Sequence, residues 1–476
     1  MGGQNSEINN YLLELDNCPE LAKFSLPDGF LLWLHVRYSL YNAFVKKKQN
    51  IVTINRNSSA DGKSNVRPSV LTTLFRVYFN NPLFNRKKYN GLIFSTTMGC
   101  IKGPTGRFTS KINHYFNQIT TQKNLNILLP GANGSIVYDG NYAYSDWLML
   151  RSSVQSKFSR SKLYFENDID SVRQLFTFLR GKIKSLLDSE ILAELEERTI
   201  EFVRLYPFIC RNVNRMLIKK RARFVVMEDG NYGGDIKMVV VRCANILGLK
   251  TIEMQHGLFD IGMKYGAAIR ANHSFEEHKT GFVFTFGKFW NRFLETSSSA
   301  VTIGYPYLEE KIKREISIKD ENILLFVSQA RFTDVLISMA DIVATHFVGR
   351  YKVIYRLHPS ESDSDSHYAK LRANPAIRIS QSGDIYSLLG SCSYVIGIFS
   401  ALLFEAQLVN KTALVLAHPL SDDHIPAEIG IRFTDATDII RKIEDKVQVP
   451  SNTKDDFWAT DWENNLSEFN NVEKLW

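Results

Sequence analysis

The sequence lacks the features that mark secreted, zinc-binding and membrane-spanning chains. Its five cysteines are spread over 476 residues and never form a CxxC pair. An odd number of widely spaced cysteines argues against a disulfide framework and a zinc site, and favours a reducing compartment. No apolar run approaches about 18 residues, and the N-terminus lacks the charged and apolar regions of a secretory signal. These absences predict a cytoplasmic protein without a transmembrane helix.

Internal repeats and long low-complexity segments are absent as well, which excludes a solenoid and a largely disordered chain. The composition that is present is ordinary for a globular protein, with 44% apolar and 23% charged residues. A chain of 476 residues is too long for one ordinary core, so we expect two domains of roughly 200 residues or more.

Positive charges exceed negative charges by 8, which favours anionic partners such as phosphates, acidic polymers or an anionic membrane surface. Basic residues cluster at 46–48, 86–88 and 219–223. Each cluster is either a solvated face or a point of contact with the inner face of the membrane, where a lipid-linked acceptor would lie. None of the standard nucleic-acid-binding signatures occurs, so no nucleic acid partner is expected.

Short apolar runs alternate with segments of helical period along most of the chain. A long helical stretch covers about 169–220, and a polar, turn-rich loop is expected at 50–68. Strands are predicted at 92–97, 125–130, 222–227, 250–255, 282–287 and 300–304, and then at 323–328, 351–357, 377–380, 394–399 and 412–417. Such alternation is typical of parallel sheets covered by helices on both faces.

A charged segment without a core-like run separates the two series of strands. We therefore predict an α/β fold made of two Rossmann-like, doubly wound domains facing a cleft. The predicted parts are an N-terminal domain over 1–305, a linker over 306–320, a C-terminal domain over 321–450 and a C-terminal tail or helix over 451–476.

Ligands of open parallel sheets bind outside the carboxyl ends of the strands, so functional residues should directly follow strands. In the N-terminal domain, Glu228 and Asp229 follow the strand at 222–227 and precede Gly230. Either one of these carboxylates is a general base for an acceptor hydroxyl, or both are helix caps and turn residues.

His256 follows the next predicted strand and lies between Gln255 and Gly257. Its imidazole would donate to phosphate or acceptor oxygens while the glycine allows close backbone approach, or it is a partly buried, hydrogen-bonded histidine. We assign Gln255 and Gly257 to the acceptor side. Arg107 and Lys111, in the segment GPTGRFTSKINHYFN, either line that side too or belong to an exposed loop.

In the C-terminal domain, Ser328 and Gln329 follow the first predicted strand, and His358 and Pro359 follow the second. Arg356 lies two residues before His358 and therefore points to the same side of the strand. Together they would hold a diphosphate or a nucleotide phosphate, and the alternative is an ordinary loop.

Ser400 follows the strand predicted at 394–399. A serine in this position caps the next helix and leaves backbone N–H groups for a phosphate. Glu405, about one turn further on, would accept hydrogen bonds from ribose hydroxyls. The alternative is a capping serine and a surface glutamate.

These motifs resemble those of a known group of enzymes. The runs KTIEMQHGLFD, FVFTFGKFW, VTIGYPYLE, ILLFVSQ, YRLHPSE and GIFSALLFEA lie within about 222–417. They resemble GT-B glycosyltransferases of bacterial capsule and lipopolysaccharide O-antigen assembly. An acidic pair before a glycine, a later HP and a serine after a late strand resemble the bacterial sialyltransferase pattern, and Kdo transferases share the HP and serine elements.

The resemblance implies a metal-independent glycosyltransferase that uses a nucleotide-sugar co-substrate and no cofactor. In this family Glu228 or Asp229 would supply the base, and His358 and Ser400 would bind the phosphate of a CMP-sugar. The acceptor would be a growing surface polysaccharide or a lipid-linked precursor. The chain has no DxD motif in a strand-loop context, where a metal would be expected.

The QHG element at 255–257 also resembles polyol-phosphate transferases of teichoic acid assembly. Three alternatives therefore stay open beside the glycosyltransferase: a CDP-polyol phosphotransferase, a sugar-nucleotide 2-epimerase, and a nucleotide-binding scaffold protein without catalysis.

Overall fold

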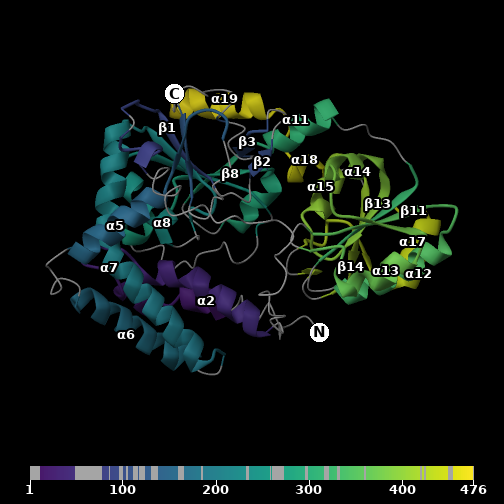
Figure 1. Cartoon of the computed structure of the whole chain (residues 1–476), viewed down its shortest axis with the longest axis horizontal. Helices are drawn as coiled ribbons and strands as arrows, with labels where there is room; N and C mark the ends of the chain where they lie inside the picture. The colour runs from purple at the N-terminus through teal and green to yellow at the C-terminus, as the bar shows by residue number, and fades with distance from the viewer. Residues whose placement is uncertain are drawn as a thin grey trace. The chain divides into compact units, whose positions relative to one another are not determined.

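The chain folds as two compact units, shown in the computed structural model of Figure 1. The N-terminal unit comprises 7–286, 290–307 and 461–476, and the C-terminal unit comprises 287–289 and 308–460. The loop predicted over 50–68 lies outside the described residues. The structure describes residues 11–48, 78–84, 86–95, 100–102, 106–110, 116, 124–129, 138–158, 166–183, 186–231, 235–257, 259, 273–294, 298–315, 321–329, 333–358, 361–418, 421–422, 425–448 and 454–474.

A parallel sheet forms the centre of the N-terminal unit. Over the described residues its strands run in the order β5-β4-β1-β6-β7-β8-β9, and every neighbouring pair is parallel. With the separate antiparallel hairpin β2–β3 set aside, this extends the 3-2-1-4-5-6 order of dinucleotide-binding Rossmann folds. The bounds are Gly91–Ser95 (β1), Cys100–Lys102 (β2), Phe108–Ser110 (β3), Asn124–Leu128 (β4), Tyr142–Tyr144 (β5), Phe224–Met227 (β6), Lys250–Met254 (β7), Phe282–Thr285 (β8) and Ser299–Thr302 (β9).

The central strands of this sheet are short and buried. β1, β4 and β6 are buried along their whole lengths, as expected for parallel strands covered on both faces. Helix α8 packs on β6 and β7, and α7 packs in turn on α2, α5, α6 and α8. Within the described ranges, none of the helices combines the length and apolar character that crossing a bilayer requires. The helices are Pro19–Lys23 (η1), Leu32–Lys48 (α2), Asp146–Phe158 (α5), Glu166–Ile183 (α6), Ser189–Lys220 (α7), Asp235–Ile246 (α8), His273–Glu277 (α10) and Lys288–Phe293 (η4).

The last helix of the chain, α19 (Trp462–Glu473), packs on the sheet of the N-terminal unit. Trp462 and Leu466 share a buried cluster with β-strand residues such as Val226, and the ring of Phe469 lies 4.9 Å from that of Phe284. These three positions recur at helical spacing and form one apolar stripe. The segment predicted as a C-terminal tail or helix thus includes part of the N-terminal core.

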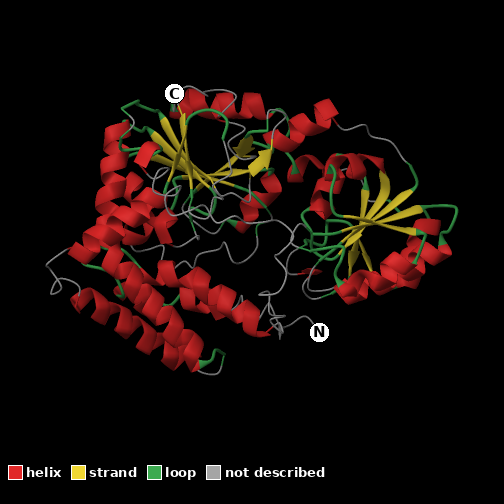
Figure 2. Ribbon diagram, in the orientation of Figure 1, coloured by secondary structure: helices red, strands yellow, loops and turns green. Residues whose placement is uncertain are grey.

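The C-terminal unit has a second parallel sheet, with the order β12-β11-β10-β13-β14-β15 over the described residues. Along the chain this is the 3-2-1-4-5-6 order itself. Figure 2 shows the strands of each unit as a central layer with helices on both faces. The predicted α/β fold class with two Rossmann-like sheets is therefore confirmed. The strands are Ile323–Val327 (β10), Lys352–Arg356 (β11), Ile377–Ser380 (β12), Cys392–Gly397 (β13), Thr412–Leu416 (β14) and Ile431–Phe433 (β15).

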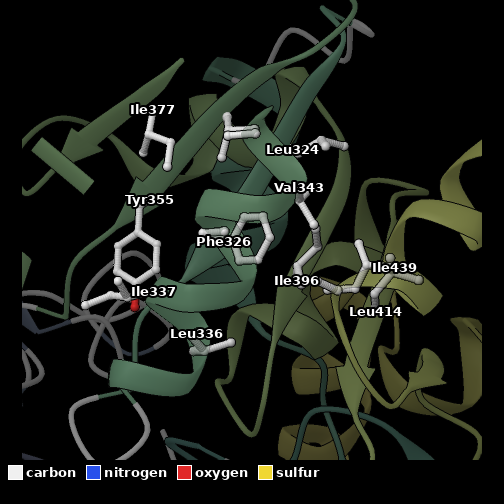
Figure 3. Close-up of a cluster of buried hydrophobic side chains, with 14 of the residues drawn as sticks. Leu324, Phe326, Leu336, Ile337, Val343, Tyr355, Ile377, Ile396, Leu414 and Ile439 are labelled. Atoms are coloured by element: carbon white, nitrogen blue, oxygen red, sulfur yellow. The ribbon is translucent and has the colours of Figure 1, made fainter. Parts of the chain in front are cut away.

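Helices α12 and α17 bury one face of this second sheet (Figure 3). Leu336 and Val343 of α12 and Ile439 of α17 share a core with strand residues including Phe326 and Ile396. The predicted linker over 306–320 contains α11, and the main segment of the C-terminal unit begins at Leu308 within that helix. The helices of this part are Pro306–Glu315 (α11), Thr333–His346 (α12), Ser366–Tyr368 (η5), Ala369–Ala373 (α13), Ile385–Ser391 (α14), Leu402–Leu408 (α15), Ala436–Glu444 (α17) and Lys454–Phe457 (α18).

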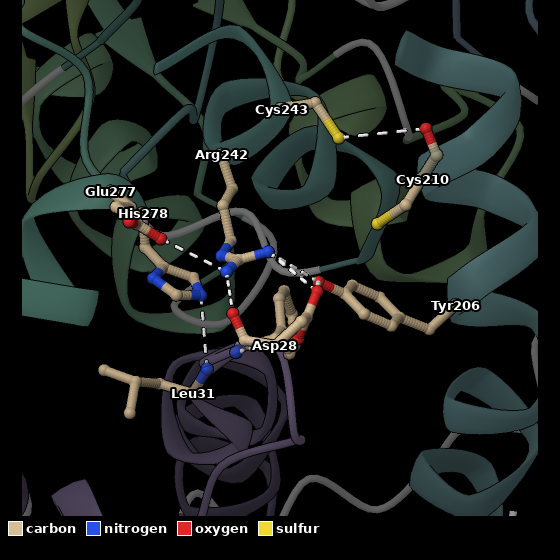
Figure 4. A network of polar contacts seen from close by, with 9 residues as sticks. Asp28, Leu31, Tyr206, Cys210, Arg242, Cys243, Glu277 and His278 are labelled. Atoms are coloured by element: carbon tan, nitrogen blue, oxygen red, sulfur yellow. Dashed lines mark hydrogen bonds and ion pairs between the residues drawn. The ribbon is translucent and has the colours of Figure 1, made fainter. Parts of the chain in front are cut away.

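A polar network around the buried side chain of Arg242 fixes helix α8 within the N-terminal unit (Figure 4). The guanidinium of Arg242 donates from Nη1 to Asp28 Oδ2 at 2.9 Å and to the Tyr206 hydroxyl at 3.0 Å. Its Nη2 lies 3.1 Å from Glu277 Oε2. Arg242 thereby ties the loop before α2 and helices α7 and α10 to α8, the helix that also carries Lys237.

Candidate active site

Glu228 directly follows β6, at the point where the strand order of the N-terminal sheet reverses between β1 and β6. Ligands of doubly wound sheets bind at such a point. The side chain of Glu228 is buried, with 4% exposed. Burial raises the pKa of the Cys100 thiol to about 11, and the negative charge of Glu228 adds to this rise. The Cys100 thiol itself shares a hydrogen bond with the Tyr138 hydroxyl.

Asp229 holds two side chains at the carboxyl edge of the same sheet. Its backbone has φ of +57°, in the left-handed region that Asp and Asn tolerate best after glycine. Its Oδ2 accepts from Lys237 Nζ at 2.7 Å, and its Oδ1 lies 3.1 Å from His256 Nε2. His256 is 32% exposed, so the imidazole can meet a substrate while the carboxylate orients it.

Hydrogen bonds to the buried residues Glu253 and Thr280 hold the loop after β6 in place. The backbone N–H of Asn231 donates to Glu253 Oε2 at 2.7 Å, and its side-chain amide exchanges hydrogen bonds with Thr280. Burial, followed by the nearby negative charge of Asp229, raises the pKa of Glu253 to about 8. Glu253 is thus largely protonated at neutral pH.

Replacing Glu253 with Gln should remove a pH dependence of stability. A carboxyl whose folded pKa is raised stabilises the fold below its unfolded pKa and loses this contribution as pH rises toward about 8. Between these values the wild-type free energy of unfolding should fall, relative to Glu253→Gln, by up to about 1.4 kcal/mol per pH unit. Urea titrations at pH 5 and pH 8 measure this, and Glu194→Gln, at an exposed position of α7, is the control. Parallel pH profiles for wild type and Glu253→Gln would refute the assignment.

The structure gives Gln255 a different place from the one predicted. Its side chain is buried, its Nε2 donates to the carbonyl of Gly257 at 2.9 Å, and its Oε1 accepts from the N–H of Phe286 at 2.7 Å. Both polar ends of the amide are used inside the unit, so Gln255 shapes the QHG turn instead of contacting an acceptor. Arg107, also predicted on the acceptor side, is exposed and pairs with Asp139 at 3.5 Å.

Three predicted residues follow three adjacent strands of the C-terminal sheet. Ser328, His358 and Ser400 come after β10, β11 and β13, and the strand order reverses between β10 and β13. His358 is exposed, whereas Ser328 is buried. The hydroxyl of Ser400 accepts from the N–H of Leu402 at 3.3 Å, at the start of α15. Gln329 and Glu405 are both partly exposed beside these residues.

Glu361, which the sequence analysis did not single out, joins two of these strand ends. Its Oε1 accepts from the Ser328 hydroxyl at 3.0 Å, and its Oε2 accepts from the N–H of His358 at 2.7 Å. In the sequence, the feature that could have indicated this role is the position of Glu361 three residues after His358, in the run HPSE.

Arg356 does not stand beside His358 as a second phosphate ligand. Its guanidinium donates to Ser380 Oγ at 2.9 Å and to the carbonyls of Ser382 and Gly383 at 2.6 and 3.0 Å. These acceptors lie at and beyond the end of the neighbouring strand β12. Arg356 therefore links the end of β11 to the loop that follows β12. Pro359 and Lys111 lie outside the described residues. Within the described ranges, no three His, Cys, Asp or Glu side chains gather as metal ligands would.

No protein-family model and no curated protein matches the chain. Among solved structures it is similar to the UDP-GlcNAc 2-epimerase of Methanocaldococcus jannaschii, with 10% identity, 80% of this chain and 99% of that chain covered, and a TM-score of 0.48. It is similar to the wall teichoic acid polymerase TagF, with 12% identity, coverage of 91% and 97%, and a TM-score of 0.44. It is also similar to the glycotransferase of kitacinnamycin, with 7% identity, coverage of 82% and 99%, and a TM-score of 0.44. Likenesses at this level assign no activity to the chain.

Proposed function

We propose that the chain is a glycosyltransferase of the GT-B type, which moves a sugar from a nucleotide-activated donor to a hydroxyl of a bacterial surface polysaccharide. The observation that carries the proposal is the pair His256–Asp229, 3.1 Å apart at the carboxyl edge of a Rossmann-like sheet. A chain with this pair and a second Rossmann-like sheet has the parts that acid–base group transfer from a nucleotide requires.

His256 is the proposed general base. An imidazole that donates from Nε2 to Asp229 carries its lone pair on Nδ1, where it can take the proton of the acceptor hydroxyl. Asp229 fixes this tautomer and stabilises the imidazolium that forms, while Lys237 holds Asp229 in place at 2.7 Å. We therefore assign the base to His256 instead of Glu228 or Asp229, because Glu228 is buried and Asp229 is paired with Lys237.

The proposed donor site is the carboxyl edge of β10, β11 and β13. The exposed imidazole of His358 and the hydroxyl of Ser400 would donate to the phosphate of the donor, and no divalent cation is included in this proposal. Based on the HP and serine motifs, the donor is a CMP-sugar such as CMP-sialic acid or CMP-Kdo. The second candidate is a CDP-polyol phosphotransferase, because the QHG element that contains His256 resembles the corresponding element of that group.

A donor panel tests the proposal with water in place of the unidentified acceptor. The full chain is incubated with CMP-sialic acid, CMP-Kdo, CDP-glycerol and UDP-GlcNAc in the presence of a chelator, and free nucleotide is measured by chromatography. The proposal predicts nucleotide release from a CMP-sugar. Release from CDP-glycerol alone would support the phosphotransferase, and conversion of UDP-GlcNAc to its epimer without release would contradict transfer.

Glu361 is expected to act on donor binding by positioning Ser328 and His358. Glu361→Ala removes two hydrogen bonds to a charged acceptor and should raise KM for the donor by about 10- to 100-fold, with kcat changed much less. Glu361→Gln keeps one acceptor for Ser328 and should recover part of this loss. Steady-state kinetics of nucleotide release separate the two constants. A fall in kcat without a change in KM would rule out this positioning role.

A further inference from the structure

Two basic clusters that lie about 130 residues apart in the sequence meet on one surface of the N-terminal unit. Lys88 Nζ donates to the carbonyl of Lys219 at 2.9 Å, and Lys220 Nζ donates to the carbonyl of Lys87 at 3.2 Å. The N–H of Tyr89 donates to the carbonyl of Lys220 at 3.0 Å. We call this surface the basic patch; it consists of Arg86, Lys87, Lys88, Lys219, Arg221 and Arg223, while Lys220 is buried beneath it.

Few carboxylates balance the positive charge of the basic patch. Burial lowers the pKa of the underlying Lys220 to about 8, and the charges of Lys219 and Lys88 in the patch add to this effect. The sequence has no Asp or Glu between Asp61 and Asp139, and none between Glu201 and Glu228. Both segments that build the patch therefore bring cations without carboxylates to balance them.

Exposed apolar side chains adjoin the basic patch. Tyr78, Phe79 and Phe84 are 61%, 62% and 55% exposed, and the Tyr78 ring lies 5.2 Å from Phe79 and 5.3 Å from Phe84. Lys219 Nζ donates to the carbonyl of Leu83, the residue before Phe84. Ile218, beside Lys219 on α7, is 63% exposed. A cluster of apolar side chains on a solvent-exposed surface is typical of an interaction site.

We infer that the basic patch and its aromatic neighbours Tyr78, Phe79 and Phe84 bind the face of an anionic lipid bilayer. Lys and Arg are attracted by anionic headgroups, and aromatic rings settle at the level of the headgroups. A soluble polyanion would be held by the cations alone and would leave the three exposed rings without a role. This inference is independent of the reaction, because none of these residues belongs to the candidate site.

Vesicle cosedimentation of the full chain tests the inference. Vesicles of phosphatidylcholine alone are compared with vesicles that contain about one third phosphatidylglycerol, and only the anionic vesicles should bind the protein. The charge variant Arg86→Ser, Lys87→Ser, Arg223→Ser should weaken binding by about 100-fold. The aromatic variant Tyr78→Ser, Phe79→Ser, Phe84→Ser should weaken it by at least tenfold, and more strongly in high salt, where the electrostatic part is screened.

Matched controls remove the same kinds of side chain elsewhere. Arg173→Ser, Arg198→Ser, Lys313→Ser removes three cations that are 63%, 68% and 65% exposed. Phe158→Ser, Val348→Ser, Val472→Ser removes three exposed apolar side chains. Both control variants should bind vesicles like the wild type, and circular dichroism confirms that every variant is folded. Equal weakening in test and control variants would overturn the inference. The inference would also be overturned if the aromatic variant bound vesicles like the wild type and the wild type bound DNA or heparin more tightly than anionic vesicles.

Discussion

Replacing His256 with Ala is expected to lower the rate of nucleotide release by about 10²- to 10⁴-fold, with KM for the donor changed by less than about threefold. The variant loses the group that takes the acceptor proton, while the proposed donor site lies on the other sheet and keeps its residues. Asp229→Asn should also lower kcat strongly, because an amide no longer fixes the tautomer or stabilises the imidazolium. Single-turnover and steady-state rates of nucleotide release measure both effects.

The chain offers a matched control in a second histidine–carboxylate pair. His346 Nε2 lies 2.9 Å from Glu444 Oε1, and His346 is 39% exposed, but it ends helix α12 and does not follow a strand. His346→Ala should therefore leave the rate unchanged. A fully active His256→Ala, or an equal loss in both variants, would remove the proposed base and favour a scaffold protein that binds nucleotides without catalysis.

Replacing Asp16 with Ala is expected to destabilise the N-terminal unit by about 3–5 kcal/mol, because it leaves the charge of Arg37 buried without its carboxylate. The two side chains are 0% and 2% exposed. Arg37 donates from Nε and Nη2 to Asp16, with the shortest of these bonds at 2.6 Å, and Trp33 Nε1 donates to Asp16 Oδ1 at 2.9 Å. Chemical denaturation followed by tryptophan fluorescence measures the change, because Trp33 is itself part of the group.

The exposed pair Arg173–Asp170 serves as the control for this stability prediction. Its side chains are 63% and 57% exposed, and such surface pairs contribute roughly 0–1 kcal/mol. Asp170→Ala should therefore unfold almost like the wild type. If Asp16→Ala also unfolds like the wild type, the buried pair does not hold the segment before α2 in place.

Most of the fold could be predicted because buried parallel strands are continuous apolar runs. The runs ILLFV at β10 and FVVM at β6 are recognisable as strands because they are apolar without alternation. The helices between the strands show the helical period of about 3.6 residues instead. The strands β2, β3, β5 and β15 were missed. Each has three residues at the edge of a sheet, CIK, FTS, YAY and IRF, and runs so short carry no periodicity.

The candidate site could be predicted only in part, because the strand-end rule gives positions but not contacts. It selected Asp229, His256, Ser328 and His358 from the chain, and each of them lies within two residues of the end of a strand. The rule could not show that Arg356 turns to the end of β12, since that depends on which strand is its neighbour. The rule could not find Glu361 either. Its two hydrogen-bond partners, Ser328 and His358, follow different strands, β10 and β11, which become neighbours only when the chain folds.

Calorimetric titration of the full chain with CMP, CDP, UDP and GDP tests the central claim most directly. We predict saturable binding of CMP, weakened about tenfold by His358→Ala and by Ser400→Ala and unchanged by His256→Ala. Absence of binding by all four nucleotides, or binding of CMP that neither of the first two variants alters, would contradict a nucleotide site at the carboxyl edge of β10, β11 and β13.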